Sequence, residues 1–302
     1  MPERRRGLLM GFTAYALWGA FPLYFPLLEP AGAVEILGHR IVWTMVTMLL
    51  LLFLARRAGR LRELLRDRRT TLLLAGAALV ISFNWGVYIW GVNNERVVET
   101  SLGYFINPLV TVLLGVVVLS ERLRPVQWSA LALATLAVVV LTVDYGRPPW
   151  VALILAFSFG SYGLLKKTAN TGAVESLTLE TLVLAPVAVG YLVVLSLQGE
   201  QSFTGHGTDH MLLLASSGIV TAIPLLSFGG AATRIPMTTL GLMQYLTPTI
   251  QFCIGVLVRD EAMSGTRWLG FGLIWVALAI FTIESAVNHR RTLAEAAEAV
   301  AA

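Results

Sequence analysis

The sequence predicts an all-α polytopic membrane protein whose ten transmembrane helices form two inverted-topology repeats of five helices. Three observations lead to this prediction. First, 56% of the 302 residues are hydrophobic and only 13% are charged, whereas a soluble domain carries about 25% charged residues. Second, apolar runs of about 20 residues, each long enough to cross a bilayer, recur from end to end. Third, part of the first half of the chain recurs in the second half.

The apolar runs are interpreted as spans because a helix of about 20 residues crosses the hydrocarbon core of a membrane. The basic start, MPERRRGLLMGF, resembles the beginning of a signal peptide. Apolar sequence continues through Trp18 without a small-residue cleavage site, so we expect a retained first span. The ten predicted spans cover residues 7–28, 35–55, 71–91, 98–118, 127–143, 149–168, 177–197, 211–231, 238–258 and 268–286.

The distribution of basic residues predicts the orientation of these spans. If the N-terminus is cytoplasmic, 17 of the 22 Lys and Arg residues lie in cytoplasmic segments and four lie outside, with Arg40 inside a span. This excess places both termini in the cytoplasm of a bacterial-type cytoplasmic (inner) membrane. The alanine- and glutamate-rich segment 289–302 is expected to be a disordered cytoplasmic tail.

The repeat has a constant offset of 140 residues. Between Pro108–Thr142 and Pro248–Thr282, nine of 35 aligned positions are identical, among them Glu121 and Glu261, which we interpret as structural elements of turns. The offset assigns residues 1–146 to the first repeat and 147–288 to the second. Because each repeat has an odd number of spans, the two enter the membrane from opposite sides, and carriers built in this way bind substrate between the halves near the midplane.

Several classes of function do not fit this sequence. One cysteine, Cys253, excludes an intrachain disulfide and a multi-cysteine metal site. No phosphate-binding loop of the G-x-x-x-x-G-K-[ST] type is present, which argues against ATP coupling within the chain. The spans contain scattered serines and one histidine, too few for a catalytic set. We therefore expect no enzymatic activity, no cofactor and no metal site. We also expect no nucleic-acid binding, because the positive charge lies in the loops between the spans.

Charged residues inside spans are costly and mark candidate functional positions. Glu35 and His39 are four residues apart and share a helix face. They are candidates for proton coupling, as is Glu180, and His39 also for substrate binding. The alternative is that Glu35 caps the helix start and that His39 is a packing residue.

Arg40 and Glu180 are related by the 140-residue offset. If both face the axis between the halves, they form an ion pair that acts as a gate or recognises a charged substrate. A purely structural ion pair is the alternative, since buried partners satisfy each other without substrate.

Uncharged polar and aromatic residues within the spans are candidates for the lining of a cavity. Asn84 and Tyr88 lie one helical turn apart, and Asn107 precedes Pro108, whose missing donor frees a carbonyl in the preceding turn. Simple kinks at the prolines and interfacial aromatic residues are the alternative interpretation. Together with His39, Arg40 and Glu180, the predicted substrate-binding residues are Trp18, Tyr24, Asn84, Trp85, Tyr88, Tyr104, Asn107, Ser158, Tyr162, Gln244, Tyr245 and Gln251.

The chain resembles RarD-type members of the EamA branch of the drug/metabolite transporter superfamily. The resemblance covers nearly the whole chain and includes AYALWGAFPLYF (14–25), EILGHRIVW (35–43), NWGVYIWGVNN (84–94) and ETSLGYFINPL (99–109). It implies two inverted five-helix repeats around a central cavity and the export of a small metabolite or drug. The family's name association with chloramphenicol sensitivity does not fix a substrate.

The expected function is therefore secondary active export of a small molecule by alternating access, with proton coupling left open. An uncoupled facilitator or channel for small amphiphilic solutes is the alternative. The expected partners are a small-molecule substrate and the lipid bilayer, and the fused halves allow the chain to act as a monomer.

Overall fold

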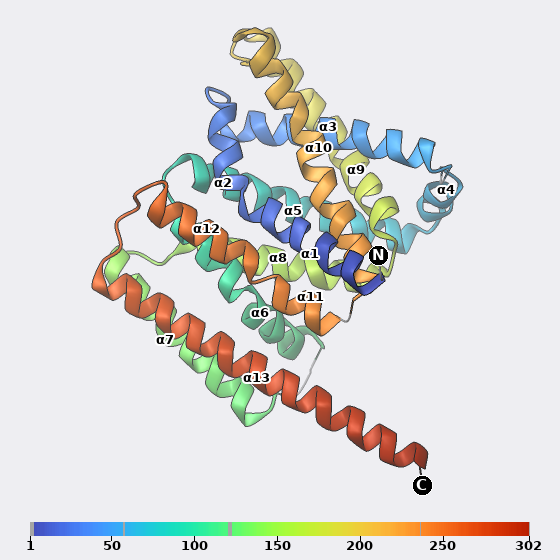
Figure 1. The fold of residues 1–302 in the computed structure, drawn as a ribbon. Coiled ribbons are helices and arrows are strands. Elements are labelled where there is room, and N and C mark those ends of the chain that lie inside the picture. Colours follow the sequence, from blue (N-terminus) through green and yellow to red (C-terminus); the bar gives the residue numbers. More distant parts are fainter. Residues whose placement is uncertain (1–2, 57, 120–122, 236, 302) are drawn as a thin grey trace.

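The computed structural model describes residues 3–56, 58–119, 123–235 and 237–301, and all regular elements in these ranges are helices (Figure 1). Glu121 lies outside the described residues. The first half contains α1 (Glu3–Gly19), α2 (Phe21–Tyr24), the 3-10 helix η1 (Phe25–Leu28), α3 (Ala33–Leu54), α4 (Ala58–Arg66), α5 (Arg68–Asn93), α6 (Val97–Leu119) and α7 (Pro125–Tyr145). The second contains α8 (Trp150–Ala169), α9 (Ala173–Leu197), α10 (Gly207–Ala232), α11 (Met237–Met243), α12 (Leu246–Leu257) and α13 (Gly265–Ala301).

Each predicted span falls on a helix or on a broken helix. Eight of the described helices are long and apolar enough to cross a membrane, and α1 with its bent continuation through η1 makes up to nine. The remaining predicted span coincides with α8, whose apolar part, Trp150–Lys166, is shorter. The prediction of a membrane protein built from helices is confirmed. The segment predicted to be a disordered tail instead continues α13 to Ala301, which projects away from the other helices in Figure 1.

Two predicted spans are interrupted by proline-rich or polar sequence. The first bends by 44° between α1 and the α2–η1 segment, where Pro22 and Pro26 occupy the first turns of the two short helices. Proline suits a helix start because its missing N–H would be unpaired there anyway. The ninth span breaks between α11 and α12 at Gln244 and Tyr245, just before Pro248.

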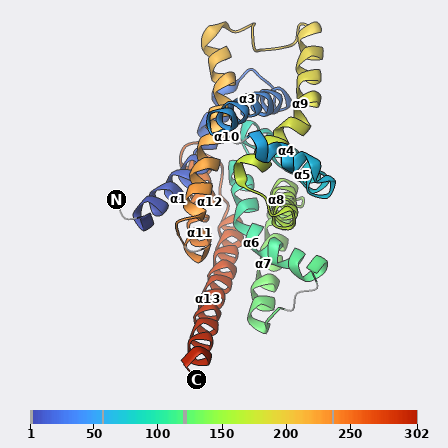
Figure 2. The same cartoon turned by 90° about the vertical axis from the view of Figure 1, so that its right-hand side faces the viewer.

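Helix packing follows the 140-residue offset. Contacts of α5 and α6 with α8 correspond, with the halves exchanged, to contacts of α10 and α12 with α1. Likewise, α3 packs on α10 as α9 packs on α5, and the equivalent helices α7 and α13 pack on each other. Figures 1 and 2 show α7 and α13 side by side at one edge of the bundle. The two halves are thus interleaved, so a site at their boundary draws side chains from both.

The contact between α3 and α10 is especially close. A Cβ atom added at Gly218 of α10 would lie 2.3 Å from the backbone carbonyl of Trp43 in α3, which leaves room for glycine alone. One turn away on each helix, Thr221 and Arg40 face each other. The glycine therefore lets a short hydroxyl side chain from the second half reach an arginine of the first.

Candidate functional site

Arg40 is the centre of a polar site between the halves. Its side chain is only 3% exposed, and its Nε donates a hydrogen bond of 2.9 Å to Oγ1 of Thr221. The guanidinium carbon lies 4.2 Å from the centre of the Trp85 ring, 5.3 Å from Phe21 and 5.6 Å from Phe25. The positive charge is therefore held by aromatic faces, whose electron density attracts a cation. Its Nη1 is buried and makes no hydrogen bond to the described part of the chain.

A second contact across the halves joins α5 and α12 beside this arginine. Nε2 of Gln251 donates to the hydroxyl of Tyr88 at 2.9 Å and to the carbonyl of Trp18 at 3.1 Å. The Tyr88 ring packs edge-on against Phe25, with centroids 5.9 Å apart. Oε1 of Gln251 is buried and has no hydrogen-bond partner among the described residues. Tyr88 and Gln251 thus extend the site and keep unused hydrogen-bonding capacity.

Asn84 connects the Arg40 site to α8. Its Nδ2 donates to Oγ of Ser158 at 2.8 Å and to the carbonyl of Leu155 at 3.0 Å, while the Tyr104 hydroxyl lies 3.5 Å from its Oδ1. The Tyr104 ring packs edge-on against Tyr88. On the opposite side, the Tyr24 hydroxyl donates to the carbonyl of Leu213 at 2.9 Å. The structure therefore gathers nine predicted residues into one cluster: Trp18, Tyr24, Arg40, Asn84, Trp85, Tyr88, Tyr104, Ser158 and Gln251.

The predicted ion pair between Arg40 and Glu180 is wrong. Oε1 of Glu180 instead lies 2.7 Å from Nζ of Lys166, and its Oε2 accepts from the Tyr162 hydroxyl at 3.1 Å. Ser176, one turn before Glu180, contacts both members of the pair. Because only a short loop separates α8 from α9, Lys166 in the last turn of α8 is a local partner for Glu180, whereas Arg40 projects from α3 toward α10. Glu180 and Tyr162 therefore form a second cluster, apart from Arg40.

Glu35 acts as an anchor at the start of α3. Its Oε1 accepts a hydrogen bond of 2.7 Å from the backbone N–H of Ser202 in the loop between α9 and α10. Nε2 of His39 lies 4.0 Å from the same oxygen, and the His39 ring stacks on Phe203 with centroids 4.7 Å apart. These contacts match the capping and packing alternatives for the two residues, and they bind α3 to a loop of the second half.

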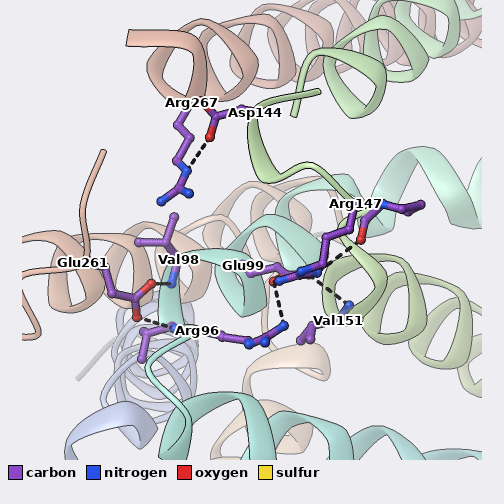
Figure 3. Close-up of polar contacts among 10 residues, drawn as sticks. Arg96, Val98, Glu99, Asp144, Arg147, Val151, Glu261 and Arg267 are labelled. Atoms are coloured by element: carbon purple, nitrogen blue, oxygen red, sulfur yellow. Dashed lines mark hydrogen bonds and ion pairs between the residues drawn. The ribbon is translucent and has the colours of Figure 1, made fainter. Parts of the chain in front are cut away.

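A charged cluster closes the end of the bundle at which α6, α8 and α13 begin (Figure 3). Glu261, in the loop after α12, accepts from the backbone N–H groups of Val97 and Val98 at the first turn of α6. Glu99 pairs with Arg147 at 2.7 Å and accepts from the N–H of Val151 at the start of α8. Carboxylates suit both places because helix N-termini have unpaired donors and a positive dipole. The cluster lines a cavity of about 370 Å³.

The electrostatics of this cluster follow from burial and pairing. Burial raises the pKa of Glu261, although its two N–H bonds and the nearby Arg259 and Arg267 oppose the shift. The hydrogen bonds with Glu99 raise the pKa of Arg147. Arg267 is itself paired with Asp144 of α7 at 2.6 Å. The side chain of Glu261, which was predicted to be a structural element of its turn, bonds to the start of α6 and so connects the second half to the first.

Comparison with known proteins places this architecture in a family. A model of the EamA-like transporter family matches residues 5–143. Protein RarD of Streptomyces exfoliatus is 56% identical over 97% of this chain and 93% of its own. The chain belongs to the RarD-type proteins of the EamA-like transporter family. Protein RarD of Escherichia coli is 42% identical over 96% of this chain and 98% of its own.

A more distantly related sequence and a solved structure also match this chain. A Pseudomonas aeruginosa relative named chloramphenicol-sensitive protein RarD is 29% identical over 93% of this chain and 95% of its own. A crystal structure with 20% sequence identity superposes with a TM-score of 0.61 over 93% of this chain and 98% of its own. The structural match shows a shared fold and nothing about substrate.

Besides His39, Tyr162 and Glu180, three predicted site residues of this RarD-type chain lie outside the Arg40 cluster. Tyr245 points to α13, where its hydroxyl lies 3.5 Å from Oγ1 of Thr282. Gln244 sits at the break between α11 and α12 and has no side-chain hydrogen bond to a described residue. Oδ1 of Asn107 is buried without a hydrogen-bond partner in the described ranges.

Residue-type reasoning missed Thr221, Phe21, Phe25 and Lys166. A single threonine or phenylalanine in an apolar span gives no signal, because both residue types are common there. Lys166 is visible in the sequence as a basic residue near the end of a span, but its proximity to Glu180 depends on how the chain turns from α8 into α9. The α3–α10 contact that selects Thr221 likewise has no signature in the sequence.

Proposed function

We propose that the chain is a secondary active transporter that exports a small metabolite or drug across the cytoplasmic membrane by alternating access. The observation that carries this proposal is Arg40, a buried cation with an unused donor at the boundary of two interleaved halves. A charge inside a membrane protein is retained for function more often than for stability. Membership in the EamA-like transporter family supports the same conclusion.

In this proposal the helices make ten crossings, with α8 as the sixth, and the two halves have opposite orientations with both termini in the cytoplasm. The substrate binds where hydrogen bonds cross between the halves, at Arg40–Thr221 and Tyr88–Gln251. Rocking of the halves exposes this place to each side in turn. Glu261 acts as a latch on the outer side, since its bonds to α6 hold the loop of one half on the helix of the other.

The coupling of transport to protons would require a titrating side chain in the mechanism, and the candidates are Glu35, His39 and Glu180. An uncoupled facilitator is the second candidate, and a specific observation favours it. Glu180 is already paired with Lys166, and Glu35 is bound to the backbone of Ser202. Both carboxylates therefore already have a hydrogen-bonding partner, and neither needs to take up or release a proton to obtain one.

Uptake into everted membrane vesicles separates these candidates. The labelled solutes are amino acids, aromatic amines, aromatic acids and chloramphenicol, with and without an acid-inside gradient. A proton-coupled exporter predicts saturable accumulation that requires the gradient and is lost in Glu180→Gln, while Glu200→Gln, in an exposed loop, behaves as the wild type. Equilibration without accumulation would support the facilitator. Flux that never saturates would contradict a carrier of either kind.

A further inference from the structure

The environment of Arg40 specifies the charge of the molecule that it binds. Resting on the transport function above, we propose that the substrate is an organic anion with a carboxylate, bound by the guanidinium of Arg40, and that its apolar part is flat and aromatic. Three features of the site support this proposal: the missing counter-ion of Arg40, the unused hydrogen-bonding groups and the surrounding aromatic rings.

Arg40 lacks an acidic partner although it is almost fully buried. Two other buried acids have a cation within ion-pair distance: Glu180 has Lys166, and Glu99 has Arg147. In the described ranges no carboxylate lies within ion-pair distance of Arg40, and the closest acid along its own helix, Glu35, bonds to Ser202. A buried charge without a counter-ion is strongly unfavourable. An anion that arrives from outside the chain would remove this cost.

The unused hydrogen-bonding groups match a carboxylate. Nη1 of Arg40 is a buried donor without an acceptor in the described chain, and a planar guanidinium binds carboxylate oxygens in a fixed geometry. The Tyr88 hydroxyl accepts a bond from Gln251, so its own proton is free to be donated. Two donors of this kind suit an oxyanion, whereas an ammonium group would meet the positive charge of Arg40.

The aromatic side chains around Arg40 indicate the shape and polarity of the rest of the ligand. The rings of Phe21, Phe25 and Trp85 surround the guanidinium, and Tyr88 and Tyr104 pack edge-on next to them. Such rings bind a flat apolar group by offset or edge-on packing. Oε1 of Gln251 remains as an acceptor for a donor on the ligand. The complete set fits a small aromatic acid better than an inorganic ion.

The test measures the melting temperature of the purified full-length protein in detergent with three compounds of similar shape. Phenylacetate carries the carboxylate, phenylacetamide is neutral, and 2-phenylethylamine is a cation. We expect saturating phenylacetate to raise the melting temperature by about 3 °C or more, while the amide and the amine have no effect. Arg40→Gln should abolish the shift and Arg40→Lys should reduce it. The control Arg259→Gln, which removes an exposed arginine, should leave it unchanged.

Two outcomes would overturn the proposal. One is an equal effect of acid and amide, including no effect of either. The other is a shift of the same size with sodium chloride alone, which would make Arg40 a site for a small inorganic counter-ion. Ligand-free Arg40→Gln should melt at or above the temperature of the wild type, because it loses an unpaired buried charge. If Arg40→Gln fails to fold, Arg40 is structural and the proposal fails, unless Thr221→Val folds and weakens the acid-specific shift.

Binding in detergent does not depend on transport, so the two proposals can fail separately. Acid-specific binding without flux in vesicles would retain the anion site and contradict the transporter. Saturable flux of neutral solutes without acid-specific binding would retain the transporter and contradict the anion site.

Discussion

Replacement of Lys166 by methionine is expected to lower the free energy of unfolding by about 3 kcal/mol. The substitution leaves the Glu180 carboxylate, whose side chain is 2% exposed, without its cation at 2.7 Å. Removing one partner of a buried ion pair costs about 3–5 kcal/mol because the other charge stays buried. The side chain of Lys166 is 24% exposed, so water reaches the pair and the lower end of this range applies.

Thermal or denaturant unfolding in detergent micelles measures this effect. The double variant Lys166→Met with Glu180→Leu should recover most of the loss, since both charges are then removed. The matched control is Arg6→Met, which breaks an exposed ion pair with Glu3 and should cost less than about 1 kcal/mol. A double variant no more stable than Lys166→Met would show that the pair itself is not the source of the effect.

Replacement of Glu261 by alanine is expected to lower the free energy of unfolding by about 2 kcal/mol and to loosen the end of the bundle at which α6 begins. The backbone N–H groups of Val97 and Val98 lose their acceptor, and each unpaired donor costs about 1–3 kcal/mol when buried. Because Glu261 is only partly buried, water can hydrogen-bond to the unpaired N–H groups in its place, which limits the loss of stability.

The same unfolding measurement serves for this variant, with Glu200→Ala as the control in another loop. Glu261→Gln should lie between Glu261→Ala and the wild type, because an amide oxygen accepts one of the two bonds. Faster hydrogen exchange at Val97 and Val98 should accompany the loss. Unchanged exchange at these two amides, with lower stability elsewhere, would show that Glu261 does not hold α6.

The fold was largely predictable because membrane helices have a strong sequence signal. A span must be apolar over about 20 residues, and the 140-residue repeat is visible in matching pairs such as Pro108 and Pro248. Helix breaks and extensions were less predictable. The break at Gln244 and Tyr245 depends on how the chain before Pro248 packs on its neighbours. The helical continuation of α13 to Ala301 was missed because the spans were assigned from apolar runs alone, although alanine and glutamate are strong helix formers.

The sequence indicated the residues of the candidate site better than the contacts between them. Arg40, Asn84 and Tyr88 stand out because polar groups are rare in apolar spans, and the structure clusters them. The partner of Arg40 was predicted wrongly because the repeat offset gives equivalent positions and not side-chain directions. Arg40 turns toward Thr221 on α10, and Glu180 finds Lys166 on the adjacent helix. Such choices depend on helix rotation, which the sequence does not encode locally.

The most direct test of the central claim is the accessibility of the Arg40 site from the two sides of the membrane. Thr221→Cys, in a background with Cys253→Ala, is labelled with a membrane-impermeant maleimide in right-side-out and in everted vesicles. Alternating access predicts labelling from both sides, with more labelling from outside when Glu261→Ala opens the latch. Labelling from neither side, or from one side only and unchanged by Glu261→Ala, would contradict a carrier with its binding site at Arg40.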